Sequence, residues 1–265
     1  MITAGIDTGS RTLKAVLWDN SRQTILARRL CDQGVQQHAL AQSLFDDLLT
    51  DAGIKRGAVT SIAATGHGRH LLSFCSTTIN EITCHAVGAI HLHPDAVTLI
   101  DIGGQDCKLI RFDNDGKVRD FVMNDRCAAG TGRFLEVVAD RLEVPLDELG
   151  NYSQRSDNPT PISSICVVFA ETEIIGQLAQ GQSRENIIAG VQNSIVRRLV
   201  AMAGRTMDKP VYFTGGAALV SGMRQALETV LEQPVRVCQW PQFTGALGAA
   251  ILAAQRTTPI TNINL

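Results

Sequence analysis

The sequence repeats itself, and this internal duplication limits the possible folds more than any other feature. Residues 6–20 read IDTGSRTLKAVLWDN and residues 100–114 read IDIGGQDCKLIRFDN, with six of fifteen aligned positions identical and no gap. Each copy predicts a strand that ends at an aspartate, a glycine turn and a second strand. A third strand is expected at 24–30 and again at 118–123. The chain should therefore form two similar α/β halves.

Apolar residues at helical spacing predict the helices that follow these strands. The expected helices are 37–51, 81–92, 131–142, 169–180, 184–205 (after a Ser183 cap) and 242–256, and further strands are expected at 61–65, 211–214 and 235–237. We expect residues 1–94 to form a first lobe and residues 95–241 a second lobe. Residues 242–256 should cross back to the first lobe as a helix, and residues 257–265 should form a polar tail.

Composition and charge exclude several classes of protein. The 265 residues are 45% hydrophobic and 19% charged, which is typical of a globular protein. A net charge of −2 gives no electrostatic basis for binding nucleic acid or a membrane surface. No apolar run has the length of a membrane span, and no targeting segment is recognisable at the start, so we expect a cytoplasmic protein.

Glycine turns follow the expected strands and are suited to phosphate binding. Glycine lets the backbone approach a phosphate and point N–H groups at it. These turns are DTGS at 7–10, TGHG at 65–68, DIGGQ at 101–105 and TGG at 214–216, and His67 and His70 are further candidate phosphate contacts. Because no G-x-x-x-x-G-K-[ST] sequence occurs, a P-loop enzyme is not expected.

Two aspartates and a glutamine in these turns are candidate catalytic residues. Asp7 and Asp101 can hold Mg²⁺, since this ion takes few protein ligands and keeps several waters. Gln105 is neutral and can orient an attacking water without deprotonating it. The sequence therefore predicts a magnesium-dependent nucleotide site.

Seven cysteines form neither a disulfide framework nor a local zinc motif, because the number is odd and no C-x-x-C occurs. Cys127 and Cys166 each precede a predicted helix, where N–H groups favour a thiolate. Two such thiolates per chain complete a four-cysteine iron–sulfur site if a two-fold axis passes through it. Spacing alone leaves two buried cysteines as the alternative. The others, Cys31, Cys75, Cys84, Cys107 and Cys238, are expected to be small buried hydrophobes.

The paired I-D-x-G turns and the F-T-G-G at 213–216 resemble the phosphate and adenosine loops of the superfamily of actin, heat-shock ATPases and sugar kinases. This resemblance implies a duplicated, ribonuclease-H-like α/β fold with mixed sheets, two lobes and ATP between them. The segment QFTGALGA at 242–249, with Gln242, resembles the last nucleotide-side segment of that superfamily.

Three motifs resemble one branch of that superfamily, the activator components of 2-hydroxyacyl-CoA dehydratases and the ATP-binding subunits of benzoyl-CoA reductase. They are NDRCAAGTGRF at 124–134, SICVVFAETE at 164–173 and DIGGQD at 101–106, and the similarity runs from Gly5 to about Ala253. It implies a 4Fe–4S cluster shared by Cys127 and Cys166 across a homodimer. It also implies ATP/ADP and Mg²⁺ at Asp7, Thr8, Gly9, Ser10, Asp101, Gly103, Gly104, Gln105, Thr214, Gly215, Gly216 and Gln242.

The function implied by this resemblance is an archerase-like, ATP-dependent transfer of one electron. Reduced flavodoxin or ferredoxin would supply the electron, and a 2-hydroxyacyl-CoA dehydratase-type iron–sulfur protein would accept it after ATP changes the angle between the lobes. One alternative is an ATP-dependent sugar or amino-sugar kinase with Asp106 or Asp125 as the base. Another is a regulatory ATP-binding module that performs no redox work.

Overall fold

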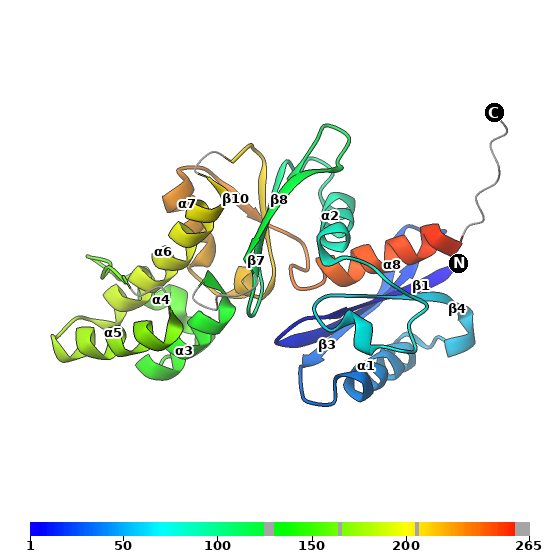
Figure 1. Cartoon of the computed structure of the whole chain (residues 1–265), viewed down its shortest axis with the longest axis horizontal. Coiled ribbons are helices and arrows are strands. Elements are labelled where there is room, and N and C mark those ends of the chain that lie inside the picture. Colours follow the sequence, from blue (N-terminus) through cyan, green and yellow to red (C-terminus); the bar gives the residue numbers. More distant parts are fainter. Residues whose placement is uncertain (125–129, 164–165, 205–206, 258–265) are drawn as a thin grey trace. The chain divides into compact units, whose positions relative to one another are not determined.

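A computed structural model describes residues 1–124, 130–163, 166–204 and 207–257 (Figure 1). The chain divides into two compact units. The first unit comprises Met1–Pro94 together with the segment that begins at Gln242, and the second comprises Asp95–Pro241. Among the expectations above, those for Cys127, Asp125 and the tail from residue 258 lie outside the described residues.

Each unit contains one five-stranded mixed sheet, and the two sheets have the same topology. The first sheet has the order β3-β2-β1-β4-β5 and the second the order β8-β7-β6-β9-β10. In each sheet the first three strands pair antiparallel and the last two extend the sheet in parallel. The strands are β1 (Ile2–Thr8), β2 (Thr12–Asp19), β3 (Thr24–Asp32), β4 (Val59–Thr65), β5 (Thr77–Thr78), β6 (Thr98–Ile102), β7 (Cys107–Phe112), β8 (Val118–Asn124), β9 (Val211–Thr214) and β10 (Val235–Val237).

Helices cover both sheets. The first unit contains α1 (Gln37–Ala52), α2 (Glu81–Leu92), α8 (Thr244–Thr257) and the short turns η1 (Arg56–Ala58) and η2 (Arg69–Leu71). The second unit contains α3 (Gly132–Leu142), α4 (Leu149–Ser153), α5 (Val167–Ala179), α6 (Arg184–Ala203), α7 (Met223–Leu231), η4 (Leu146–Glu148) and η5 (Gly216–Leu219). The predicted cap of α6 is confirmed, because the Ser183 hydroxyl accepts a hydrogen bond from the Asn186 N–H at 3.2 Å.

Several element boundaries differ from the sequence prediction. The last helix begins at Thr244 and not at Gln242, because the Pro241 carbonyl is held by hydrogen bonds from Thr214 and Gly215. Helix α5 begins two residues earlier than expected, at Val167. The sequence prediction missed α4, α7 and β5, which are too short for helical or strand periodicity to be decisive.

The alternation of side chains along β2 divides the core of the first unit into two layers. Leu13, Ala15 and Leu17 pack with α1, while Val16 and Trp18 pack with α8. Figure 1 accordingly draws α1 and α8 on opposite sides of the first sheet. The second unit has one larger core between its sheet and α3, α5, α6 and α7. Within the described residues, no helix is both long enough and apolar enough to cross a membrane.

Helices α2 and α8 approach so closely that their contact requires glycine. A Cβ atom on Gly88 of α2 would lie 2.0 Å from the Thr244 carbonyl oxygen, and a Cβ atom on Gly248 of α8 would lie 1.8 Å from the Cys84 carbonyl oxygen. Both obstacles are backbone atoms, which a change of rotamer cannot move away. The two helices therefore pack as one layer against the first sheet.

We expect Gly88→Ala to destabilise the protein by about 1–3 kcal/mol or more, because α2 and α8 must separate to admit the methyl group. The free energy of unfolding in urea measures this loss. The matched control is Gly57→Ala in η1, where a Cβ atom meets nothing within 4 Å. Its stability should stay within about 0.5 kcal/mol of the wild type. Equal stabilities of the two variants would contradict the packing described for α2 and α8.

Candidate functional site

The glycine turn that follows β1 packs against the turn that follows β4. The carboxylate of Asp7 is buried, and the Thr8 hydroxyl donates to the Thr65 carbonyl at 2.9 Å. The Gly68 N–H donates to the Thr8 carbonyl at 3.2 Å. Gly66 has a φ of +84°, and a Cβ atom there would lie 2.4 Å from Asp7 Oδ1. Glycine is therefore required at residue 66 both by its backbone conformation and by the carboxylate beside it.

The second unit repeats this arrangement after β6 and β9. Asp101 is 2% exposed, and Gly215 has a φ of +88°. A Cβ atom on Gly215 would lie 2.7 Å from Asp101 Oδ1 and 2.3 Å from the Ile102 carbonyl oxygen. The duplication visible in the sequence thus extends to a buried aspartate with a left-handed glycine beside it in each unit.

Each buried aspartate forms an ion pair with a lysine on the neighbouring strand. Lys14 Nζ lies 3.5 Å from Asp7 Oδ2, and these two residues face each other in the register of β1 and β2. Lys108 Nζ lies 3.2 Å from Asp101 Oδ2 and 2.6 Å from Asp106 Oδ2, in the equivalent register of β6 and β7. A buried carboxylate is tolerated when it is paired and hydrogen-bonded, so each lysine offsets the cost of burying its aspartate at the strand end.

The first helix of the second unit is attached directly to its glycine turn. The Gly132 N–H donates to the Gly103 carbonyl and the Arg133 N–H donates to the Gly104 carbonyl, both at 2.9 Å. The N–H groups of Gly132 and Arg133 are therefore not available to bind an anion at the start of this helix, because they already donate to carbonyls of the turn. Cys127 precedes α3 in the sequence and lies outside the described residues.

The other predicted nucleotide residues lie in these turns or next to them. Gln105 is exposed in the turn between β6 and β7, where its amide is accessible to solvent. Thr214 is buried, and its hydroxyl donates to the Pro241 carbonyl at 2.6 Å. Gly9, Ser10, Gly103, Gly104, Gly216 and Gln242 are half-buried, and Thr8 is buried. His67 and His70 are exposed beside the β4 turn.

The cysteines fall into two groups by exposure. Cys166 is exposed as the N-cap residue of α5. Cys84, Cys107 and Cys238 are buried, whereas Cys31 and Cys75 are half-buried. Burial raises the pKa of Cys107 to about 11 and the pKa values of Cys75 and Cys238 to about 12. In the part of the chain that the structure describes, no three His, Cys, Asp or Glu side chains gather as a metal site.

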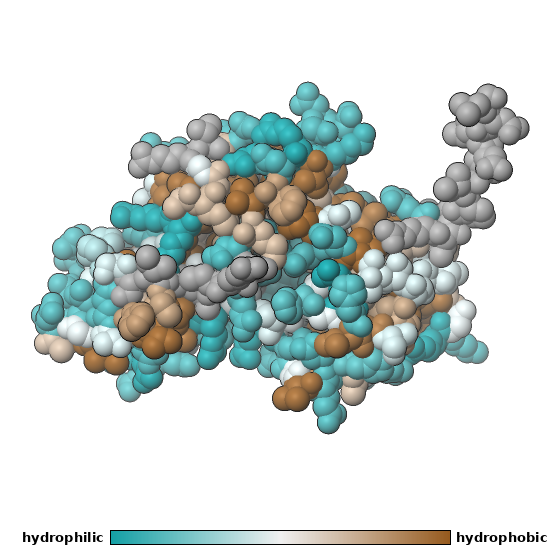
Figure 2. All heavy atoms as spheres, viewed as in Figure 1, coloured by the Kyte–Doolittle hydropathy of each residue, from teal (hydrophilic) through white to brown (hydrophobic). Residues whose placement is uncertain are grey.

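Helix α5 presents an apolar surface directly beside Cys166. Val168 and Phe169 are each 68% exposed, and Ile175 further along the helix is 52% exposed. Figure 2 shows brown, apolar atoms gathered over the second unit near α3 and α5. Exposed apolar surface of this kind is typical of a contact with another protein.

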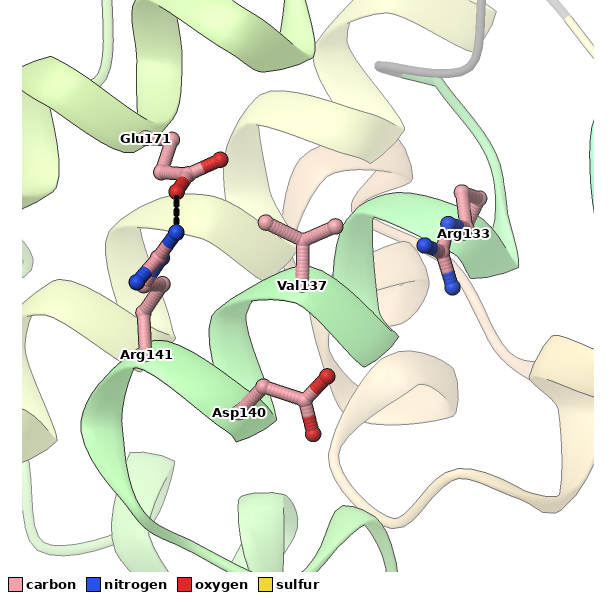
Figure 3. A pocket seen from close by; sticks show the side chains of 5 residues that line it. All are labelled: Arg133, Val137, Asp140, Arg141 and Glu171. Atoms are coloured by element: carbon pink, nitrogen blue, oxygen red, sulfur yellow. Dashed lines mark ion pairs between the residues drawn. The ribbon is translucent and has the colours of Figure 1, made fainter.

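A pocket of about 360 Å³ lies between α3 and α5 (Figure 3). Arg141 near the end of α3 and Glu171 in α5 point toward each other and form an ion pair. Arg133, Val137 and Asp140 complete the lining. The pocket contains none of the predicted nucleotide residues. The ion pair between Arg141 and Glu171 connects α3 with α5 beside this pocket.

The two duplicated sheets and their buried aspartates define an ATPase of the actin and sugar-kinase fold. More particularly, the chain belongs to the BadF/BadG/BcrA/BcrD ATPase family, whose model matches residues 4–253. The family resemblance found in the sequence is thereby confirmed. An activator of lactoyl-CoA dehydratase from Anaerotignum propionicum is 45% identical over 254 residues, which cover 96% of this chain and 97% of that protein.

Solved structures agree with this assignment. The (R)-2-hydroxyglutaryl-CoA dehydratase component A of Acidaminococcus fermentans matches with a TM-score of 0.89 and 38% identity, covering 97% of this chain and 98% of that chain. The ADPNP-bound activator of 2-hydroxyisocaproyl-CoA dehydratase from Clostridium difficile has the same TM-score at 37% identity and covers 100% of both chains. A ROK family glucokinase from Streptomyces griseus has a TM-score of 0.56 at 14% identity over 96% of this chain and 100% of its own, which shows the fold alone. The predicted fold class is confirmed.

Sequence reasoning missed the roles of Lys14 and Lys108, and it did not single out Arg69. Both lysines are identical positions of the internal repeat, and this identity was the signal that could have identified them as partners of the aspartates. Arg69 stands in the turn after β4, three residues beyond Gly66. Nothing in its spacing distinguishes it from an ordinary surface arginine.

We expect Lys108→Met to destabilise the protein by about 3 kcal/mol, because it leaves the buried carboxylate of Asp101 without its lysine. Urea unfolding monitored by circular dichroism measures the change. The control is Lys117→Met, which removes an ion pair with Asp115 whose two side chains are 77% and 74% exposed. That variant should lie within about 0.5 kcal/mol of wild type. Similar losses in both variants would show that the Lys108 pair does not hold the strand end together.

We expect iodoacetamide at pH 8 to modify Cys166 and to leave Cys107 largely unmodified in the folded, iron-free protein. The thiolate is the reactive form, and raising the pKa of Cys107 from 9.0 to about 11 lowers its thiolate fraction at this pH about a hundredfold. Peptide mass spectrometry measures labelling at each residue. Both cysteines should react after denaturation, and equally fast labelling of both in the folded protein would contradict the burial of Cys107.

Proposed function

We propose that the chain is an ATP-dependent activator that transfers one electron to a 2-hydroxyacyl-CoA dehydratase-type iron–sulfur protein. The observation that carries this proposal is the 45% identity over nearly the whole chain to an activator of lactoyl-CoA dehydratase. The exposed Cys166 at the start of α5 supports it, because an electron carrier must bring its redox centre to the protein surface.

ATP is proposed to bind through the glycine turns that follow β1, β6 and β9. Backbone N–H groups of Gly9, Gly104 and Gly216 would approach the nucleotide without interference from side chains. Asp7 and Asp101 supply carboxylate oxygens, the donors that Mg²⁺ prefers, at the ends of equivalent strands. The exposed amide of Gln105 is free to orient the attacking water, which leaves inorganic phosphate and ADP as products.

Cys166 and Cys127 are proposed to bind a 4Fe–4S cluster, which when bound accepts and releases one electron at low potential. Cys166 fits this role because its thiol is a suitable donor and is exposed. Two chains are needed to provide four thiolates, which supports a homodimer with its two-fold axis at the cysteines. The exposed Val168 and Phe169 next to Cys166 provide apolar surface for that contact.

Contacts within the second unit connect the glycine turn after β6 with α3 and α5. The carbonyls of Gly103 and Gly104 accept hydrogen bonds from the first turn of α3, and α3 is tied to α5 by the Arg141–Glu171 ion pair. A shift of the turn on ATP binding or hydrolysis would therefore move α3 and α5, which follow Cys127 and Cys166 in the sequence. ATP biases this movement only if the two arrangements bind ATP and ADP with different affinities.

The remaining partners follow from this chemistry. A reduced flavodoxin or ferredoxin is proposed as the electron donor, and the dehydratase-type protein is the acceptor. The sugar-kinase alternative is less well supported, because the dehydratase activators are 37–45% identical to this chain, whereas the ROK family glucokinase is 14% identical.

Anaerobic purification with iron quantitation and a mass measurement of the oligomer tests the proposal. We expect about four iron atoms per two chains, a brown protein and ATP-dependent reduction of an added dehydratase component. Cys127→Ser and Cys166→Ser should each abolish the colour and most of the iron.

The matched control is Cys31→Ser, which removes a half-buried cysteine from β3 and should leave the iron content unchanged. Equal iron contents in Cys166→Ser and Cys31→Ser would contradict the electron-transfer proposal. A colourless wild-type protein that phosphorylates a sugar would favour the kinase alternative.

A further inference from the structure

The turn after β4 and the turn after β9 are structural counterparts that differ in chemistry. Both begin with Thr-Gly, both place the glycine in the left-handed region, and both enclose a buried aspartate, as described above. The next four residues are His-Gly-Arg-His at 67–70 in the first unit and Gly-Ala-Ala-Leu at 216–219 in the second. The first turn is thus rich in cationic and imidazole groups, whereas the second is small and apolar.

This divergence indicates that the two turns favour different chemical groups. The exposed Leu219, at 59%, can lie against an uncharged group such as a base or a ribose but offers nothing to an anion. Arg69 offers a permanent positive charge and a planar set of N–H donors that matches the oxygens of a phosphate. The first unit's turn is therefore suited to an anionic group such as a phosphate.

Within the described part of the chain, the charge of Arg69 has no fixed counter-ion. The guanidinium is half-buried, and its Nη1 donates to the Gly66 carbonyl at 3.0 Å. Among the residues that the structure describes, no carboxylate lies within ion-pair distance of it. Arg56 of the same unit, in contrast, pairs with Asp46 at 3.0 Å. A half-buried cation costs solvation free energy that an anionic ligand would restore.

Arg69 also lies beside the turn that is proposed to bind phosphate. The hydrogen bond from the Gly68 N–H to the Thr8 carbonyl joins the residue before Arg69 to the turn after β1. Since β1 and β4 are parallel neighbours, their carboxyl ends meet at one edge of the sheet. His67 and His70 are less suitable for the same role because they are exposed and carry a charge only when protonated.

We propose that Arg69 binds the terminal phosphate of ATP and so allows the protein to distinguish ATP from ADP. This inference rests on the proposed function, in which the turn after β1 binds phosphate. One N–H group of Arg69 remains on the Gly66 carbonyl, and the others bind phosphate oxygens. Loss of the terminal phosphate on hydrolysis would leave the Arg69 charge without its ligand.

Isothermal titration of ADPNP and of ADP, each with Mg²⁺, into wild type, Arg69→Gln and Arg69→Lys tests the proposal. We expect Arg69→Gln to weaken ADPNP binding about tenfold or more and to leave ADP binding within about twofold of wild type. Arg69→Lys should be intermediate, because it keeps the charge and loses the planar donor set.

The matched control is Arg22→Gln, which removes the same charge from a 77% exposed side chain in the turn between β2 and β3, at the opposite end of the sheet. It should bind both nucleotides as the wild type does. Equal weakening of ADPNP and ADP in Arg69→Gln would overturn the proposal and show that Arg69 only braces Gly66, and unchanged affinity for both would overturn it as well. A wild type that binds neither nucleotide would instead count against the proposed function.

Discussion

The structure depends on a buried aspartate at the end of the central strand of each unit. The Asp7–Lys14 and Asp101–Lys108 pairs lie at the same place in the duplicated register, opposite one another across an antiparallel strand pair. Because burying a carboxylate without a partner is costly, each lysine makes it possible to hold a negative charge at a strand end. The neighbouring glycines then have to lack side chains, since the carboxylate oxygens fill the space that a Cβ atom would need.

The two units differ in the turns that follow their strands. In the second unit the carbonyls of Gly103 and Gly104 accept hydrogen bonds from the first turn of α3. In the first unit the counterpart of the small, apolar 216–219 segment carries Arg69. The turn after β6 is therefore joined to α3, whereas the turn after β4 differs from its counterpart after β9 by carrying the charge of Arg69.

Much of the fold could be predicted because its signals are local. The repeat of I-D-x-G, the helical spacing of α1 and the Ser183 cap all depend on residues a few positions apart, and the structure agrees with them. The short α4 and α7 were missed because so few residues carry little periodicity. The glycines at 66 and 215 were recognised as turn residues, but the reason for them, an aspartate oxygen 2.4 to 2.7 Å from an added Cβ atom, is a contact across strands.

The sequence by itself determined that the chain is a duplicated α/β protein of the dehydratase-activator family, because strand order, glycine turns and motifs are written in consecutive residues. Only the tertiary structure decided which cation accompanies which carboxylate, that Asp106 is engaged by Lys108, and that Arg69 lacks such a partner among the described residues. These facts depend on strand register and on the pairing of distant turns, and no spacing along the chain specifies either.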